Sequence, residues 1–403
     1  MIRLKNILIF FSMIILSACS QAVSTKGESS LSEQEISQSA EANESSTTPA
    51  GQRVYLTSTP QPTPSVNAYP VSTTQPTALV ITDQQLNPLT GLPVDDAAIL
   101  ERHLILVKLA NWPREERPQA GLSQADMVFE YYIGSQMNQF LALYYGEEVQ
   151  AVGPVRSGRL VDSQIANLYQ GFLLYANAEL AADEVLQEDL GPRALKFGDL
   201  PCPPLCGGAD TASGDAFVDT AALTAYLREN DLESTLPDLA GMTFQMEPAR
   251  DDGPGRTLQV SYADFSIMQW RYDERSQSYA LWTESEAADG LALAPLTDRN
   301  NDLTIHFDNI VVLYTTYKSY TDTLHDVSLI DQEGYQAMML FRDGRVSFGA
   351  WVIPGVNKPL VFETPDGNPL PLKPGRTWVV MVGQSSITNQ AGNGEWEIDF
   401  RLP

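Results

Sequence analysis

The sequence predicts an α+β protein: an N-terminal layered α/β domain with a mixed sheet, followed by a β-rich C-terminal domain. Between residues 85 and 245, apolar strand-like runs alternate with stretches of helical periodicity. After residue 257, short apolar runs are separated by turn residues instead. The charged segment Met246–Arg256, which contains Asp-Asp-Gly-Pro-Gly, separates the two regions with these different patterns. We therefore expect domains at residues 85–245 and 257–403.

The N-terminus has the features of a secretory signal peptide over residues 1–18. Arg3 and Lys5 precede a short apolar core, and the segment ends in Leu-Ser-Ala before Cys19. This ending resembles the lipobox of bacterial lipoproteins. The resemblance implies cleavage before Cys19 and attachment of a lipid, with acyl chains such as palmitate, to its thiol. The mature chain would then be anchored to the cell membrane on its extracytoplasmic face. The alternative is an ordinary cleaved signal followed by a chance cysteine.

Residues 19–84 read as the lipidated cysteine and a disordered tether. They are rich in Ser, Thr, Gln, Glu and Pro and have no apolar periodicity, so they cannot bury enough surface to fold. A flexible segment of this length spans about 45 Å on average.

In the N-terminal domain, apolar runs and helical spacing mark the elements in turn. The strands are expected at His103–Leu109, Ala125–Ile133, Gln139–Tyr145 and Gly171–Ala176, and the helices at Leu160–Tyr169, Ala181–Leu190 and Thr220–Asn230.

In the C-terminal domain the expected elements are short strands. They are Leu258–Tyr262, Ser266–Tyr272, Ser278–Thr283, Asn309–Thr315, Tyr335–Arg342, Val346–Ile353, Leu360–Glu363, Thr377–Val382 and Trp396–Phe400. Asp343-Gly344 between two of them predicts a hairpin.

Composition limits the function. The 403 residues carry 25 Lys and Arg against 51 Asp and Glu, a formal net charge of −26. Because nucleic-acid binding needs a concentrated basic face, no nucleic-acid partner is expected. Cys202 and Cys206 predict a structural disulfide, with redox and metal roles left as alternatives. The three histidines are scattered, so we expect no metal site and no cofactor.

The segment Gly153–Arg159 (GPVRSGR), called the arginine turn below, is the strongest candidate for a ligand site. It places Arg156 and Arg159 at the start of a predicted helix, where backbone N–H groups favour anions. Ser157 could cap that helix. The full set of expected ligand-binding residues is Arg117, Ser123, Asp126, Glu130, Arg156, Ser157 and Arg159.

Two other interpretations stay open. Arg156 and Arg159 could instead form structural ion pairs with Asp126 and Glu130. Alternatively, the protein could be a peptidoglycan or glycan hydrolase that uses two carboxylates, for example Glu130 and Asp162. A serine hydrolase is not indicated, because no Gly-x-Ser-x-Gly motif is present.

Three motifs carry a family resemblance: Asn87–Pro93 (NPLTGLP), Arg117–Asp126 (RPQAGLSQAD) and the arginine turn. Together with Leu372–Trp378 (LKPGRTW), they resemble the YerB-like lipoproteins, a bacterial family of domains of unknown function (DUF3048). The resemblance implies a two-domain extracytoplasmic lipoprotein and supplies no activity. Gly158, where the family is expected to have a small Ala, is a departure.

The sequence thus favours a membrane-anchored protein with an anionic-ligand pocket. We expect a non-catalytic binding or scaffold protein of the cell envelope. Its partners would be the membrane, through the lipid on Cys19, and a cell-wall polymer or an envelope protein.

Overall fold

A computed structural model describes residues 85–207, 216–232, 235–287, 290–320, 325–330, 332 and 336–403. The predicted signal peptide, Cys19 and the whole predicted tether (residues 19–84) lie outside these residues. The described residues belong to one compact unit.

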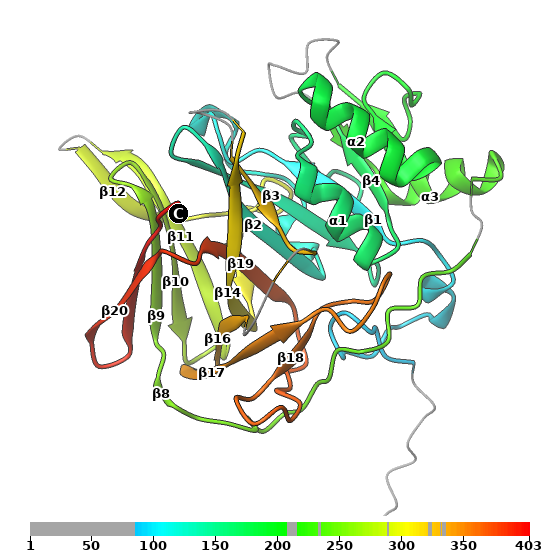
Figure 1. Cartoon of the computed structure of the whole chain (residues 1–403). Coiled ribbons are helices and arrows are strands. Elements are labelled where there is room, and N and C mark those ends of the chain that lie inside the picture. Colours follow the sequence, from blue (N-terminus) through cyan, green and yellow to red (C-terminus); the bar gives the residue numbers. More distant parts are fainter. Residues whose placement is uncertain are drawn as a thin grey trace, which may run out of the picture. The chain divides into compact units, whose positions relative to one another are not determined.

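Twelve strands of the described residues form one large mixed sheet, shown with its helices in Figure 1. Its main path runs β18 (Val361–Glu363), β17 (Arg345–Val352), β16 (Ala337–Arg342), β14 (Asn309–Ser319), β19 (Thr377–Gly383), β2 (Met127–Gly134), β3 (Met137–Tyr144), β1 (Ile105–Leu109), β4 (Phe172–Tyr175) and β5 (Ala194–Lys196). Strand β15 (His325–Ser328) pairs with β14, and β8 (Gly253–Pro254) pairs with β17.

Strand β19 joins the two halves of the chain within this sheet. It lies parallel to β14 on one side and parallel to β2 on the other, with Thr377 opposite Met127. Strands from both sides of the predicted boundary at Met246–Arg256 therefore hydrogen-bond to one another in a single sheet.

The second sheet packs against the large one. Its order is β12 (Gly290–Pro295), β11 (Ser278–Ala287), β10 (Ser266–Asp273), β9 (Thr257–Ala263), β21 (Glu395–Asp399) and β20 (Ile387–Gly392), with β13 (His306–Phe307) paired to β11. A small two-stranded sheet consists of β6 (Leu205–Cys206) and β7 (Phe217–Val218).

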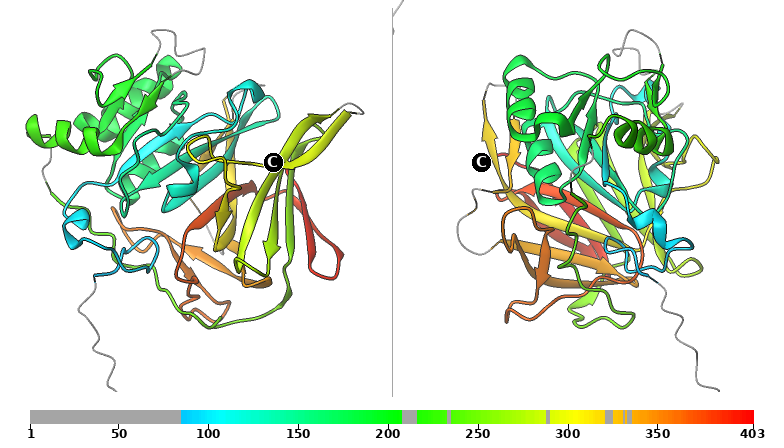
Figure 2. Two further views of the ribbon diagram at one scale, coloured as in Figure 1. Left: turned by 180° about the vertical axis from the view of Figure 1, so that it is seen from behind. Right: turned by 90° about the vertical axis from the view of Figure 1, so that its right-hand side faces the viewer.

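Helices cover the opposite face of the large sheet near β1 and β4, as the two further views in Figure 2 show. They are α1 (Leu160–Leu168) and α2 (Leu180–Leu190), which contact β4 and β5. The third helix is α3 (Thr220–Glu229), and the short 3-10 turns are η1 (Ala97–Leu100), η2 (Arg114–Glu116), η3 (Leu122–Gln124) and η4 (Gly191–Arg193).

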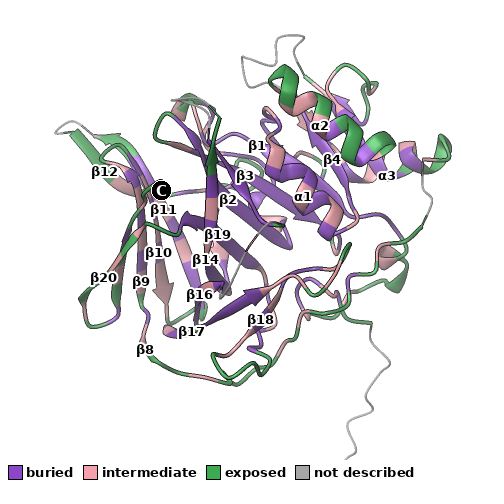
Figure 3. Ribbon diagram, viewed as in Figure 1, coloured by how far each residue is buried: buried purple, intermediate pink, exposed green. Residues whose placement is uncertain are grey.

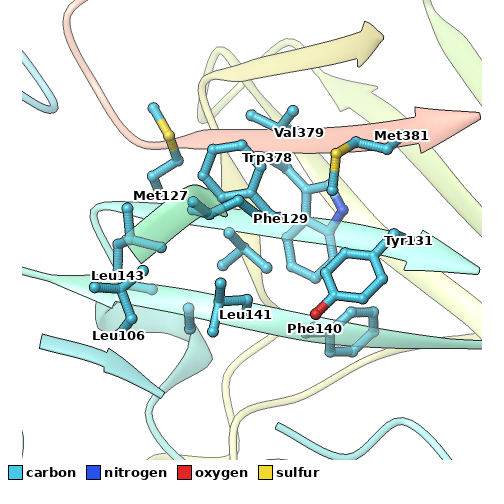
Figure 4. Close-up of a cluster of buried hydrophobic side chains, with 14 of the residues drawn as sticks. Leu106, Met127, Phe129, Tyr131, Phe140, Leu141, Leu143, Trp378, Val379 and Met381 are labelled. Atoms are coloured by element: carbon cyan, nitrogen blue, oxygen red, sulfur yellow. The ribbon is translucent and has the colours of Figure 1, made fainter. Parts of the chain in front are cut away.

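Strand β2 is buried at every position (Figure 3). Its side chains alternate between the two faces of the large sheet, and both faces are covered. Phe129 points towards α1 and meets Tyr169 at a ring-centroid distance of 5.7 Å. Tyr132 points the other way and stacks on Phe400 at 4.6 Å. Figure 4 shows the core around β2, β3 and β19, where Trp378 packs edge-on against Phe140.

The prediction of an α+β chain with a mixed sheet is confirmed at that level. The three predicted helices form, and the Asp343-Gly344 turn joins β16 to β17. Strands β5, β6, β7, β8, β12, β13, β15 and β20 were not predicted. No helix among the described residues is both long and apolar enough to cross a membrane.

Candidate ligand-binding site

The arginine turn runs along the end of β1, where Arg156 N donates to Lys108 O at 2.9 Å. The Arg156 side chain is buried and forms an ion pair with Glu116. Burial lowers the pKa of Arg156. The structure therefore supports an ion-pair interpretation for Arg156, but with Glu116 as the partner in place of Asp126 or Glu130.

Arg159 immediately precedes α1, and the protein's own carboxylates occupy the start of that helix. Asp162 accepts from Arg159 N at 2.7 Å, and Asp326 accepts from Leu160 N at 2.7 Å. Ser157 does not cap the helix as predicted, because its hydroxyl bonds to Asn177. The backbone donors expected to face an anion are thus partly satisfied internally.

A buried polar cluster lies beneath this helix start. Tyr131 hydrogen-bonds both Lys108 and Asp162, and Lys108 Nζ lies 3.8 Å from Asp162 Oδ1. Burial lowers the pKa of Lys108 to about 8. Burial, together with the neighbouring Asp162, raises the pKa of Asp326 to about 7. These groups hold α1 and β15 against the sheet.

Glu130 is fully buried on the opposite face of β2. It accepts from Trp378 Nε1 at 2.8 Å, Asn138 Nδ2 at 2.6 Å and Tyr262 OH at 3.0 Å. Burial raises its pKa to about 7. Because Asp162 belongs to α1 on one face of the large sheet while Glu130 faces the second sheet, the two carboxylates cannot flank one glycosidic bond. This arrangement contradicts the predicted catalytic pairing of Glu130 with Asp162.

Arg117 lies at a cleft of about 360 Å³ between η2 and strands β11 and β12. Its Nη2 lies 2.9 Å from Glu284 Oε1, and its Nε donates to Asn111 O at 2.9 Å. Burial lowers the pKa of Arg117. Its guanidinium is therefore largely occupied by internal partners.

Asp126 and Ser123 lie on a different part of the molecule. Asp126 accepts from Asn87 Nδ2 at 2.7 Å and Gly146 N at 3.0 Å, and burial raises its pKa. Ser123 N donates to Asp298 Oδ2 at 2.7 Å. The predicted site residues thus do not gather at one place, but Asp126 and Ser123 line two clefts that share Gln124 and Arg376.

The larger of these two clefts, called the Arg376 cleft below, has a volume of about 460 Å³. Its lining is polar apart from one exposed leucine and contains no aspartate or glutamate. It consists of Ser123, Gln124, Asn300, Asn301, Leu303, Thr304, His306 and Arg376. In so acidic a chain, a cleft lined without carboxylates is suited to an anionic ligand.

Arg376 follows a turn that holds its backbone in place. Arg376 N donates to Asp308 Oδ2 at 2.9 Å. The preceding Gly375 has φ +148°, and a Cβ atom there would lie 2.1 Å from Asp308 Oδ2. Within the described residues, the Arg376 guanidinium makes no hydrogen bond or ion pair. Its donors are therefore available to a carboxylate or phosphate.

His306 contributes an imidazole ring to the lining of the cleft. Its Nδ1 lies 3.1 Å from Ser278 Oγ, and burial lowers its pKa below the usual 6.5. The ring is therefore neutral at pH 7 and leaves Arg376 as the cationic group of the lining.

Sequence reasoning did not select Arg376 or His306 as site residues. A signal for Arg376 was present, since Lys-Pro-Gly-Arg directly precedes a predicted strand. Its meaning depends on the parallel pairing of β19 with β2, which places Thr377 N within 3.2 Å of Asp126 O. No local pattern reveals that pairing.

The cysteines and possible metal ligands give no further site. Cys202 and Cys206 are joined by a disulfide with their Cα atoms 4.8 Å apart. No group of three or more His, Cys, Asp or Glu side chains within the described part of the chain could hold a metal ion.

Comparison with known proteins identifies relatives over most of the chain. YerB from Bacillus subtilis (strain 168), whose name describes it as a lipoprotein, is 26% identical over 333 residues, which cover 77% of this chain and 91% of YerB. The crystal structure of the Bacillus subtilis YerB protein matches with a TM-score of 0.60 and 23% identity, covering 74% of this chain and 97% of that one. It shows a shared fold.

Two family models match separate parts of the sequence. The N-terminal domain of the family of unknown function DUF3048 matches residues 89–201, and its C-terminal domain matches residues 258–379. The chain therefore belongs to the DUF3048 family.

Proposed function

We propose that this protein is a membrane-anchored, non-catalytic binding protein of the cell envelope whose ligand presents a carboxylate or phosphate to Arg376. The observation that carries the proposal is a guanidinium that makes no hydrogen bond or ion pair with a described residue, in a cleft lined without carboxylates. Its electrostatic neighbour is Asp308, which does not line the cleft. The anchoring part rests on the predicted lipid on Cys19 and on the description of YerB as a lipoprotein.

The remaining lining residues fit a polar, extended ligand. Gln124, Asn300 and Asn301 carry side-chain amides, which can donate to and accept from hydroxyl and peptide groups. Leu303 is 65% exposed and offers a small apolar contact. A fragment of a wall peptide or of a phosphate-bearing wall glycan has both the anionic group and the surrounding hydrogen-bonding groups.

The test is calorimetric titration of the full mature chain in detergent micelles with purified muropeptides and with a phosphate-bearing wall polymer. Arg376→Gln should weaken binding about 10-fold or more, because a hydrogen bond to a charged group contributes about 1.5–3 kcal/mol. Arg401→Gln is the matched control, since Arg401 is exposed near the C-terminus and lines none of the clefts described above.

The variant Arg159→Gln tests whether the ligand binds at the arginine turn instead of the Arg376 cleft. If Arg159→Gln abolishes binding while Arg376→Gln leaves it unchanged, the ligand binds at the arginine turn and the Arg376 cleft is rejected. Absence of binding by the unaltered chain to both ligands would reject the proposed function itself.

A further inference from the structure

Strand β12 is the outermost strand of the smaller sheet (Figure 1). It pairs with β11 in an antiparallel ladder from Trp282–Pro295 to Ala287–Gly290. No other strand of the described residues pairs with it. Its second edge is therefore open to a further strand.

The register shows which backbone groups point outward. Leu296 N donates to Leu281 O, so Ala294 and Ala292, two and four residues earlier, also direct their N–H and C=O groups towards β11. The intervening Leu291 and Leu293 direct theirs away from the sheet. Their N–H groups have no hydrogen-bond partner in the described structure.

The sequence of β12 carries only one protecting feature of an edge strand besides its short length, the proline at its end. Gly290–Pro295 reads GLALAP, which contains no charged side chain, and Leu291 is 45% exposed. Edge strands are normally protected by charged side chains, bulges, proline or very short length. Here the proline comes last, after both outward N–H groups.

The same edge borders the 360 Å³ cleft. Exposed carboxylates in this cleft indicate that a partner bound there would be basic. Arg114 and Arg117 in this cleft both bind Glu284, at 3.4 and 2.9 Å. Glu115 and Glu286 also line it, are exposed, and form no ion pair with any described residue. Leu291 lies opposite Glu286 in the ladder, so the two side chains share one face.

We propose that β12 is a docking edge for an extended basic segment of a partner protein. The segment would add a strand to the sheet through Leu291 and Leu293 and place Lys or Arg side chains beside Glu115 and Glu286. A second copy of this chain is a poorer occupant, because two chains of net charge −26 repel one another.

The experiment is amide hydrogen exchange of the full mature chain with two synthetic probes, an alternating Lys–Val octapeptide and an alternating Glu–Val octapeptide. The Lys–Val peptide should slow exchange at Leu291 and Leu293 at least 10-fold, and the Glu–Val peptide should not. Leu293→Pro should remove the effect, because it deletes an outward N–H without breaking a bond to β11.

The charge reversal Glu115→Lys/Glu286→Lys tests the same edge with exposed substitutions that leave the ladder intact. It should abolish the effect of the Lys–Val peptide. The proposal is overturned if neither amide is protected, if both peptides protect equally, or if the chain alone dimerises with these amides protected.

Discussion

The buried carboxyl of Glu130 should make the stability of the folded protein depend on pH, and Glu130→Gln should remove that dependence. Burial raises its pKa from 4.5 to about 7, although three hydrogen-bond donors act in the opposite direction. The folded protein therefore keeps a proton that the unfolded chain releases above pH 4.5. Its free energy of unfolding must fall as the pH rises from about 4.5 to about 7, and this contribution levels off above that.

The size of the effect follows from the pKa change. At about 1.36 kcal/mol for each pH unit, a rise from 4.5 to about 7 corresponds to about 3 kcal/mol. A glutamine keeps the acceptor for Asn138 and Tyr262 but turns an N–H towards Trp378 Nε1. That mismatch costs about 1–3 kcal/mol at every pH, whereas the penalty of the charged form disappears.

Urea unfolding of both chains at pH 4.5, 5.5, 6.5, 7.5 and 8.5 measures the prediction. The stability of Glu130→Gln relative to the unaltered protein should rise by about 3 kcal/mol across this range. Other titrating groups cancel in that difference. Glu286→Gln, which changes an exposed carboxylate, should show no such trend. A difference for Glu130→Gln that stays constant with pH would refute the reasoning.

Two substitutions test the loops around the Arg376 cleft and the disulfide. Asp298→Ala removes the acceptor of Gly121 N and Ser123 N, and should lower the free energy of unfolding by about 3 kcal/mol in urea and also weaken muropeptide binding. Unchanged binding would contradict the role of this loop in the cleft. Cys202→Ser/Cys206→Ser opens a loop of five residues and should cost at most about 2 kcal/mol, with muropeptide affinity retained; a larger loss measured in urea would disprove a local role.

Apolar patterns in the sequence predicted the helices and the longer strands well. Burial of these elements determines where their apolar residues recur along the chain. Strand β2 is buried at every position, and such a strand appears in the sequence as a continuous apolar run. Strand β12 was missed for the opposite reason. Its sequence GLALAP is bounded by glycine and proline and contains no β-branched or aromatic residue, so its strand propensity is low.

The candidate site was harder to predict because ionic partners are chosen by tertiary contacts. Arg156 was correctly placed next to a helix start, yet its partner Glu116 comes from a 3-10 turn that no spacing rule connects to it. Glu130 and Tyr131 are neighbours in sequence but serve opposite layers of the fold. The position of Glu130 within an apolar run thus indicated that its side chain is buried, but not which face of the sheet it lies on.

The shared sheet explains why a ligand site would form where the two halves of the chain meet. Parallel pairing of β19 with β2 places the turn before β19 beside the loop that precedes β2, so that Arg376 and Ser123 border one cleft. Parallel neighbours start at the same edge of a sheet, and the backbone leaves the ladder there. Asp298 then binds the backbone of the loop containing Ser123 from a third segment, between β12 and β13. A cleft assembled from three distant segments exists only in the complete fold, and its affinity should therefore respond to substitutions in either half.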